Sequence, residues 1–153
     1  MSIEKAKSHA LKYLAYRPRS IQEVKDYLES KKYDKQIITE VIKYLIDLSY
    51  LDDDKFCQAW IESRCRFKPK GQKGLRYELR NKGIDNSLIE KSLAENFPPE
   101  TELEIAKNLI TRKFLAKNRS SSQEKVMAFL YRRGFSKDII HKALHHWETS
   151  NSS

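Results

Sequence analysis

The sequence predicts an all-α protein made of three tandem three-helix repeats. The first observation is a set of apolar positions that recurs every 51 residues, centred on Tyr33, Ile84 and Phe135. All eighteen aligned positions are apolar in a chain that is 39% hydrophobic. The other aligned positions are Val24, Leu75, Val126, Leu28, Leu79, Leu130, Ile37-Ile38, Leu88-Ile89, Ile139-Ile140, Ile42, Leu93 and Leu144. A period of this size indicates stacked supersecondary units.

Composition and spacing indicate that the units are helical. The chain contains four glycines and four prolines, and no segment alternates apolar and polar residues with a period of two. Its apolar residues follow helical spacing throughout. We expect three repeats at 1–50, 51–98 and 99–148, stacked in an array, followed by a polar tail at 149–153.

The first repeat is expected to begin with a helix that ends near Arg17-Pro18, because the residue before a proline disfavours the α conformation. Ser20 and Glu23 have the spacing of a capping box at the start of the second helix. Asp34 is a good N-cap for the third. The apolar faces of these helices are Ala6, Ala10, Leu11, Leu14; Ile21, Val24, Tyr27, Leu28; and Ile37, Ile38, Val41, Ile42, Leu45, Ile46.

The second repeat follows the same plan. Asp52-Asp53-Asp54 places acidic residues at the start of its first helix, where the helix dipole favours them. Pro69 has the same register as Pro18, Gly83 is expected just beyond the second helix, and Asp85 caps the third. The apolar face of the first helix is Phe56, Cys57, Trp60, Ile61 and Cys65.

The third repeat is expected to open after Pro98-Pro99 and to break between Asn118 and Ser122. Ser121 and Glu124 have capping-box spacing before its second helix. Gly134 matches Gly83, and Ser136 is the expected cap of the last helix.

Positive charge is concentrated in the middle of the chain. The net charge is +9, and residues 64–82 contain eight basic residues and one acid, Glu78. Basic residues also recur with the repeat, in the register of Arg17, Lys68 and Arg119 and in that of Lys31, Lys82 and Arg133. A single such residue is often only a solvated or dipole-compensating charge. Together they indicate a polyanion or an acidic protein surface as partner, without sequence-specific base recognition.

The aromatic residues beside this segment are less decisive. Trp60 and Phe67 could stack on unpaired bases. Helical spacing favours a core position for Trp60, and leaves Phe67 open between core and surface.

The sequence offers no convincing catalytic or metal site, and we expect a non-enzymatic protein without cofactors. His141 and His145 lie four residues apart but lack a third ligand. Cys57 and Cys65 fit buried thiols. No glycine-rich phosphate loop or nucleophile elbow occurs. The start of the chain lacks a signal-peptide pattern and no apolar run could span a membrane, so we expect a cytoplasmic protein, as a monomer.

Several motifs resemble the signature of the RecX regulatory proteins. The family pattern G-Y-L-D-D-x-x-F…S-R…G…EL…KGI is matched by Ser49-Tyr50-Leu51-Asp52-Asp53, Lys55-Phe56, Ser63-Arg64, Lys70-Gly71, Arg76, Glu78-Leu79 and Lys82-Gly83-Ile84. Arg19-Ser20-x-x-Glu23 and Arg132-Arg133-Gly134-Phe135 resemble motifs of the first and last repeats. The similarity runs from about Ala10 to Trp147. Departures are Ser49 in place of glycine, a longer loop at Lys68-Pro69-Lys70, and Gly74 in place of a basic residue.

The resemblance implies an elongated, curved array of helical repeats that binds the filament of RecA recombinase on single-stranded DNA. It implies a modulator, mostly an inhibitor, of the recombinase, ATPase and coprotease activities of RecA. The alternative is a basic helical module that binds nucleic acid and has no protein target. The residues expected to contact filament or nucleic acid are Arg17, Arg19, Arg64, Arg66, Lys68, Lys70, Lys73, Arg76, Lys82, Arg119, Arg132 and Arg133.

Overall fold

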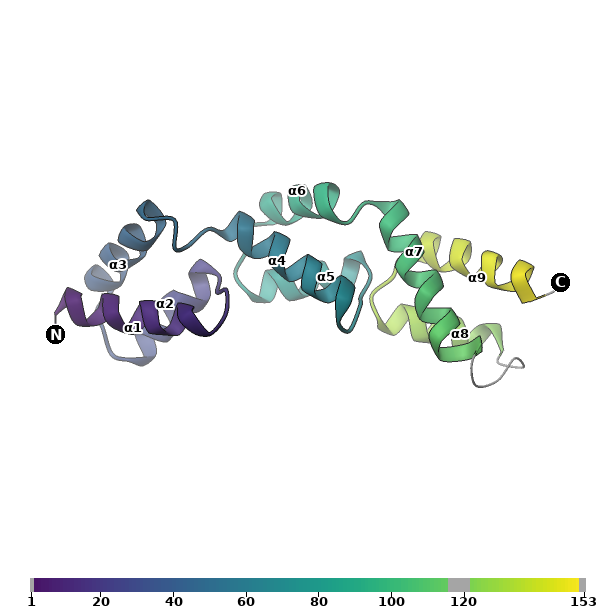
Figure 1. Ribbon diagram of the computed structural model, residues 1–153, viewed down its shortest axis with the longest axis horizontal. Coiled ribbons are helices and arrows are strands. Elements are labelled where there is room, and N and C mark those ends of the chain that lie inside the picture. Colours follow the sequence, from purple (N-terminus) through teal and green to yellow (C-terminus); the bar gives the residue numbers. More distant parts are fainter. Residues whose placement is uncertain (1, 116–121, 152–153) are drawn as a thin grey trace. The chain divides into compact units, whose positions relative to one another are not determined.

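The structure is a computed structural model that describes residues 2–115 and 122–151. In these ranges the chain forms nine α-helices and one π-helical segment, without a β-strand, which confirms the all-α prediction (Figure 1). The helices are α1 (Ile3–Tyr16), α2 (Ile21–Ser30), α3 (Lys35–Asp47), α4 (Asp53–Arg66), α5 (Gln72–Asn81), α6 (Asn86–Asn96), α7 (Pro99–Ile110), α8 (Gln123–Arg132) and α9 (Lys137–Asn151), with the π-helical segment η1 (Thr111–Leu115) after α7.

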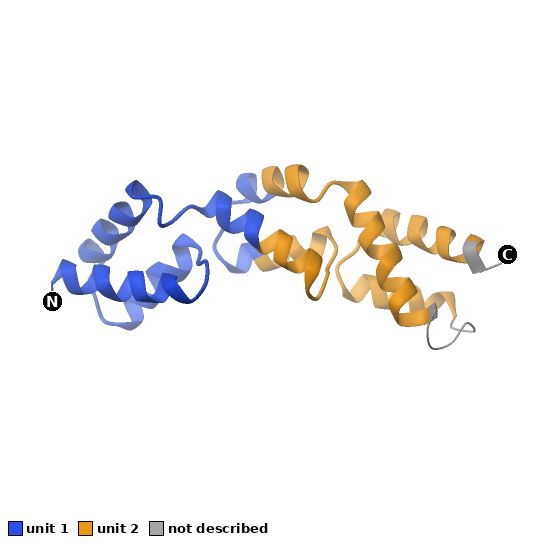
Figure 2. Cartoon of the chain, viewed as in Figure 1, with its two compact units in different colours: residues 1–59, 79–89 blue, residues 60–78, 90–153 orange. Residues whose placement is uncertain are grey.

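The chain divides into two compact units (Figure 2). The first unit contains residues 1–59 and 79–89, and the second contains residues 60–78 and 90–153. The division therefore runs through α4, α5 and α6, the middle trio of helices.

The first unit is built around an apolar core from α1, α2 and α3. Its helix starts are capped as the sequence predicts: Ser20 and Glu23 form a complete capping box, and Asp34 accepts a hydrogen bond from the backbone N–H of Ile37. The rings of Tyr13 and Tyr27 stack with centroids 4.1 Å apart. The buried residues of this core are Ala6, Ala10, Val24, Leu28, Tyr33, Ile38, Val41, Ile42, Leu45 and Leu51.

The second unit has its core among α7, η1, α8 and α9. The rings of Phe114 and Phe129 meet edge to face at 5.6 Å, which fixes η1 against α8. The buried residues of this core are Ala106, Leu109, Ile110, Phe114, Val126, Phe129, Leu130, Phe135, Ile139, Ile140, Ala143, Leu144 and Trp147. Of the eighteen aligned apolar positions, sixteen are buried, and Ile37 and Leu88 are half-buried. The 51-residue period is therefore a repeat of core positions.

The second helix of each trio ends in the same left-handed turn. Lys32, Gly83 and Gly134 have φ angles of +72°, +78° and +84°. In each case the next residue donates its backbone N–H to a carbonyl in the last turn of the helix, as Ile84 does to Leu79 at 3.2 Å. This confirms the expected positions of Gly83 and Gly134, because glycine adopts a positive φ without strain.

Three local features differ from expectation or extend it. The N-cap of α8 is Ser122, which accepts a hydrogen bond from the N–H of Lys125, so the capping box expected at Ser121 and Glu124 was misplaced. Ser121 itself lies outside the described residues, and three consecutive serines offered no way to choose between them. Helix α7 continues into η1, and the break expected from Asn118 to Ser122 lies outside the described residues up to Ser121. Ser49, which replaces the usual glycine of the signature, has a φ of +64°.

Candidate functional site

Glu78, in the second unit, accepts hydrogen bonds from three neighbouring side chains. It accepts hydrogen bonds from Arg64 at 3.0 and 2.8 Å, from Lys70 Nζ at 2.8 Å and from Trp60 Nε1 at 3.0 Å. Its side chain is only 12% exposed. Burial alone would raise the pKa of Glu78, but the hydrogen bonds from Lys70, Trp60 and Arg64 outweigh it and hold the pKa below the ordinary value. The single acid of the basic segment therefore compensates two of its cations.

Glu23 has the same role in the first unit. Its carboxylate accepts hydrogen bonds from Arg17 at 2.7 Å, from Lys82 Nζ at 3.1 Å and from the backbone N–H of Ser20 at 3.0 Å. Partial burial raises the pKa of Glu23, but the bonds from Arg17, Ser20 and Lys82 together lower it below its usual value. Arg17 and Lys82, both expected to contact a partner, are thus bound to an acid of their own chain.

Arg76 is compensated as well. Its guanidinium donates to both carboxylate oxygens of Glu90, at 2.6 and 3.0 Å, and this bidentate pair raises the pKa of Arg76. Five of the twelve predicted contact residues are therefore in ion pairs: Arg17, Arg64, Lys70, Arg76 and Lys82. Fewer positive charges are therefore available to a partner than the number of basic residues in the sequence suggests.

Four predicted residues are exposed and make no ion pair with any other described residue. They are Arg66, Lys68, Lys73 and Arg132. Arg19 and Arg133 make other contacts within the chain. The guanidinium of Arg19 is 3.8 Å from the ring centroid of Tyr13, and Arg133 donates to the carbonyl of Pro69 at 3.3 Å. Arg119, the remaining predicted residue, lies outside the described residues.

The start of α2 contacts the turn after α5. The hydroxyl of Ser20 donates to the carbonyl of Lys82 at 2.7 Å, and a Cβ placed on Gly83 would lie 2.4 Å from the Cβ of Gln22. Both contacts are inside the first unit. Lys82, one of the cations that recur with the repeat, therefore marks a place where helices of two trios meet.

The equivalent contact in the second unit is made mainly by backbone hydrogen bonds, beside the bond from the Arg133 guanidinium to Pro69. Gly71 donates its N–H to the carbonyl of Arg133 at 2.8 Å, and Lys73 donates its N–H to that of Gly134 at 3.0 Å. A Cβ on Gly71 would lie 2.5 Å from the Gly134 oxygen, and one on Gly134 would lie 2.4 Å from the Gly74 nitrogen. The sequence analysis missed this contact. The spacing of Gly71 and Gly74, in the register of Ser20 and Glu23, was the available signal.

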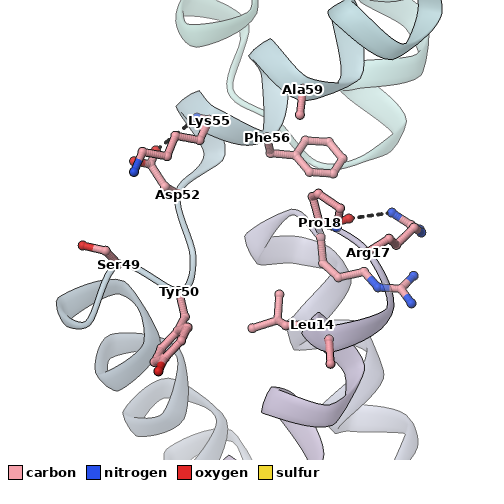
Figure 3. A pocket seen from close by; sticks show the side chains of 11 residues that line it. Leu14, Arg17, Pro18, Ser49, Tyr50, Asp52, Lys55, Phe56 and Ala59 are labelled. Atoms are coloured by element: carbon pink, nitrogen blue, oxygen red, sulfur yellow. Dashed lines mark hydrogen bonds between the residues drawn. The ribbon is translucent and has the colours of Figure 1, made fainter.

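A pocket of about 460 Å³ opens beside Arg17 and Arg19 in the first unit (Figure 3). Its apolar lining comes from Leu14, Ala15, Pro18, Phe56 and Ala59. The signature residues Ser49, Tyr50 and Asp52, together with Lys55, complete its lining. Asp52 accepts hydrogen bonds from the backbone N–H groups of Asp54 and Lys55, so this acid caps α4, as the sequence predicts.

The aromatic and thiol side chains have mixed environments. Trp60, expected in the core, is only half-buried and donates a hydrogen bond to Glu78. Phe67, for which core and surface positions were both open, is exposed. Cys57 is buried and its pKa is raised to about 11 by burial and by Asp53 and Asp54; Cys65 is half-buried, and burial raises its pKa too.

Among residues 2–115 and 122–151, no three His, Cys, Asp or Glu side chains come together as a metal site, and His141 and His145 gain no third ligand. None of the helices in these ranges combines the length and apolarity that crossing a bilayer requires.

Comparison with protein families gives three consecutive matches. The models that match are the first, second and third three-helix domains of RecX, at residues 6–45, 52–93 and 100–144. These matches confirm the three tandem three-helix repeats.

Among individual proteins, the chain is similar to the regulatory protein RecX of Oceanobacillus iheyensis, with 32% identity over 99% of this chain and 57% of that protein. It is 35% identical to the regulatory protein RecX of Bacillus subtilis, over 97% of this chain and 57% of the relative. The chain thus spans a little over half the length of these relatives. The crystal structure of RecX from Lactobacillus salivarius matches with a TM-score of 0.84 and 28% identity, covering 96% of this chain and 97% of that one.

Proposed function

The chain belongs to the RecX family of regulatory proteins, and on that premise we propose that it binds the RecA–single-stranded-DNA filament and modulates it. The expected effect is mostly inhibition of the recombinase, ATPase and coprotease activities of RecA. The protein acts by binding in the cytoplasm, without catalysis of its own. The observation that carries this proposal is the set of three RecX domain matches in order, between residues 6 and 144.

The charge of the molecule supports a partner that contains nucleic acid. A net charge of +9 favours association with a polyanion. Three similar domains can each make weak contacts with a repetitive filament, and such contacts add through effective concentration when all can engage together.

The ion pairs divide the predicted contact residues into two groups. Arg17, Arg64, Lys70, Arg76 and Lys82 bind Glu23, Glu78 and Glu90, so breaking these pairs would cost free energy that partner binding must supply. The exposed cations Arg66, Lys68 and Lys73 have no such cost. We therefore assign the main electrostatic contact of the middle domain to these three side chains.

The test is titration into a RecA ATPase and strand-exchange reaction. The unaltered chain should inhibit both, and the triple variant Arg66→Glu, Lys68→Glu, Lys73→Glu should need at least a tenfold higher concentration. A matched control, Lys5→Glu, Lys35→Glu, Lys43→Glu, makes the same charge change at exposed lysines of α1 and α3. Equal inhibition by the two variants would remove the middle domain from the contact, and no effect of the unaltered chain would refute the proposal.

The second candidate function is a nucleic-acid-binding module without a protein target, and the net positive charge favours it. That function requires affinity for bare single-stranded DNA that falls steeply with salt. It also requires no preference for DNA coated by RecA, which separates it from the first proposal.

A further inference from the structure

A basic pocket of about 220 Å³ lies in the second unit, beside η1 and α8. It is lined by Lys113, Phe114, Lys125, Ala128, Phe129 and Arg132. Of these only Arg132 stands out in the sequence pattern. Three of the six lining residues are cations, and none of the described lining residues is acidic.

The local fold explains why these side chains meet. Lys125, Phe129 and Arg132 are four and three residues apart, which places them on one face of α8. Lys113 comes from η1, and its Nζ lies 4.6 Å from the ring centroid of Phe129. Short π-helical segments are rare overall, and many of those that occur lie at functional sites. Here η1 brings Lys113 to the basic face of α8.

The charges of this pocket are uncompensated. Lys113, Lys125 and Arg132 are all exposed, and none forms an ion pair with a described residue. Residues 116–121, which connect η1 to the start of α8, contain no Asp or Glu that could compensate them. This contrasts with Glu23 and Glu78, each of which neutralises two cations. Three neighbouring cations repel one another, and a bound anion would remove that repulsion.

We propose that this pocket binds a backbone phosphate of nucleic acid, an inference that rests on the proposed function for its source of phosphate. The guanidinium of Arg132 can form a bidentate contact with phosphate oxygens, and the two lysines add point charges. The aromatic floor is closed, since Phe114 and Phe129 are 8% and 4% exposed, so no base can stack on it. The contact is therefore independent of sequence.

The test measures binding of the full chain to a fluorescent oligo(dT) by anisotropy over a range of NaCl concentrations, without RecA. The triple variant Lys113→Gln, Lys125→Gln, Arg132→Gln should reduce the slope of log K against log salt by about 0.7, the contribution of one phosphate contact in single-stranded DNA. The control Lys5→Gln, Lys35→Gln, Lys43→Gln should leave the slope unchanged. Circular dichroism of both variants checks that their helix content is kept.

Two further arms identify the ligand. If inorganic phosphate in the millimolar range competes with oligo(dT) for the unaltered chain but not for the pocket variant, the result supports a phosphate site. If polyglutamate competes and phosphate has no effect, the pocket binds an acidic protein segment and the proposal is overturned. An unchanged salt slope in the pocket variant, or undetectable binding of the unaltered chain at about 50 mM salt, overturns it as well. RecA ATPase inhibition is measured on the same samples: inhibition with an unchanged slope refutes the pocket alone, and a reduced slope without inhibition refutes only the proposed function.

Discussion

The side-chain hydroxyl of Ser20 donates a 2.7 Å hydrogen bond to the backbone carbonyl of Lys82, 62 residues later in the chain. The same hydroxyl accepts from the backbone N–H of Glu23, and Glu23 in turn binds Lys82 Nζ. A local helix cap is thus also a contact between two repeats. In the second unit, Gly71 and Arg133 make the equivalent contact through backbone atoms.

Replacing Ser20 with Ala should destabilise the protein more than loss of a helix cap does. The cap contributes about 1 kcal/mol, and loss of the part-buried hydrogen bond to the Lys82 carbonyl adds a further cost of about 0.5–1.5 kcal/mol. Urea unfolding followed by circular dichroism measures the change. Ser122→Ala is the control, because Ser122 caps α8 and is exposed; it should lose only about 1 kcal/mol. Equal losses in the two variants would show that the contact with Lys82 adds nothing.

Replacing Glu78 with Gln should lower the free energy of unfolding by about 1–3 kcal/mol at pH 7, because Arg64 and Lys70 lose their shared carboxylate. The exposed pair of Glu104 and Lys107 provides the control, since Glu104→Gln should change stability by less than about 0.5 kcal/mol. Unfolding in urea measures both. A Glu78→Gln protein as stable as the control would contradict the role of this carboxylate.

Stability should also fall in acid because of Glu78. Its pKa in the folded state lies below the unfolded value of 4.5, so the folded protein binds the proton more weakly. The stabilisation is fully present above pH 4.5 and disappears as the pH falls through the folded pKa. Comparing the original chain with Glu78→Gln between pH 7 and pH 3 isolates this contribution. The two curves should converge at low pH, and parallel curves would count against the lowered pKa.

Replacing Lys32 with Gly should stabilise the protein by about 1 kcal/mol. Lys32 has a φ of +72°, a conformation that costs residues with a side chain about 1 kcal/mol or more, and glycine occupies the equivalent turns at 83 and 134. Lys31, which has a φ of −87°, is the matched control, and Lys31→Gly should destabilise slightly. The melting temperatures of the two variants check the prediction, which fails if their order is reversed.

The two thiols should differ in reactivity. At pH 8 iodoacetamide should modify Cys65 before Cys57, because Cys57 is buried and its pKa is about 11. Peptide mass mapping after timed alkylation gives both rates. In urea the difference should vanish, and faster modification of Cys57 in the folded protein would contradict its buried position.

The fold followed from the sequence because the repeated signal is a property of the core. Tyr33, Ile84 and Phe135 are all buried. The N-caps Ser20 and Asp34 could be identified from a few neighbouring residues, because no other residue nearby competes for the same position. The position of Lys32 was also within reach, since it aligns with Gly83 and Gly134.

The state of the charged residues could not be predicted in this way. The partner of Lys82 is Glu23, 59 residues earlier, and the partner of Arg64 is 14 residues away on another helix. No spacing rule connects such residues, because their pairing depends on how the helices pack. The basic pocket at Lys113 could not be predicted for the same reason, because it depends on how the π-helical segment η1 packs against α8.

The most direct test of the account compares binding of the chain to bare and to RecA-coated single-stranded DNA at about 150 mM salt. A filament modulator should bind the coated strand at least tenfold more tightly, a difference of about 1.4 kcal/mol. Equal or weaker binding to the coated strand would contradict a RecA-directed function and leave a general nucleic-acid-binding protein.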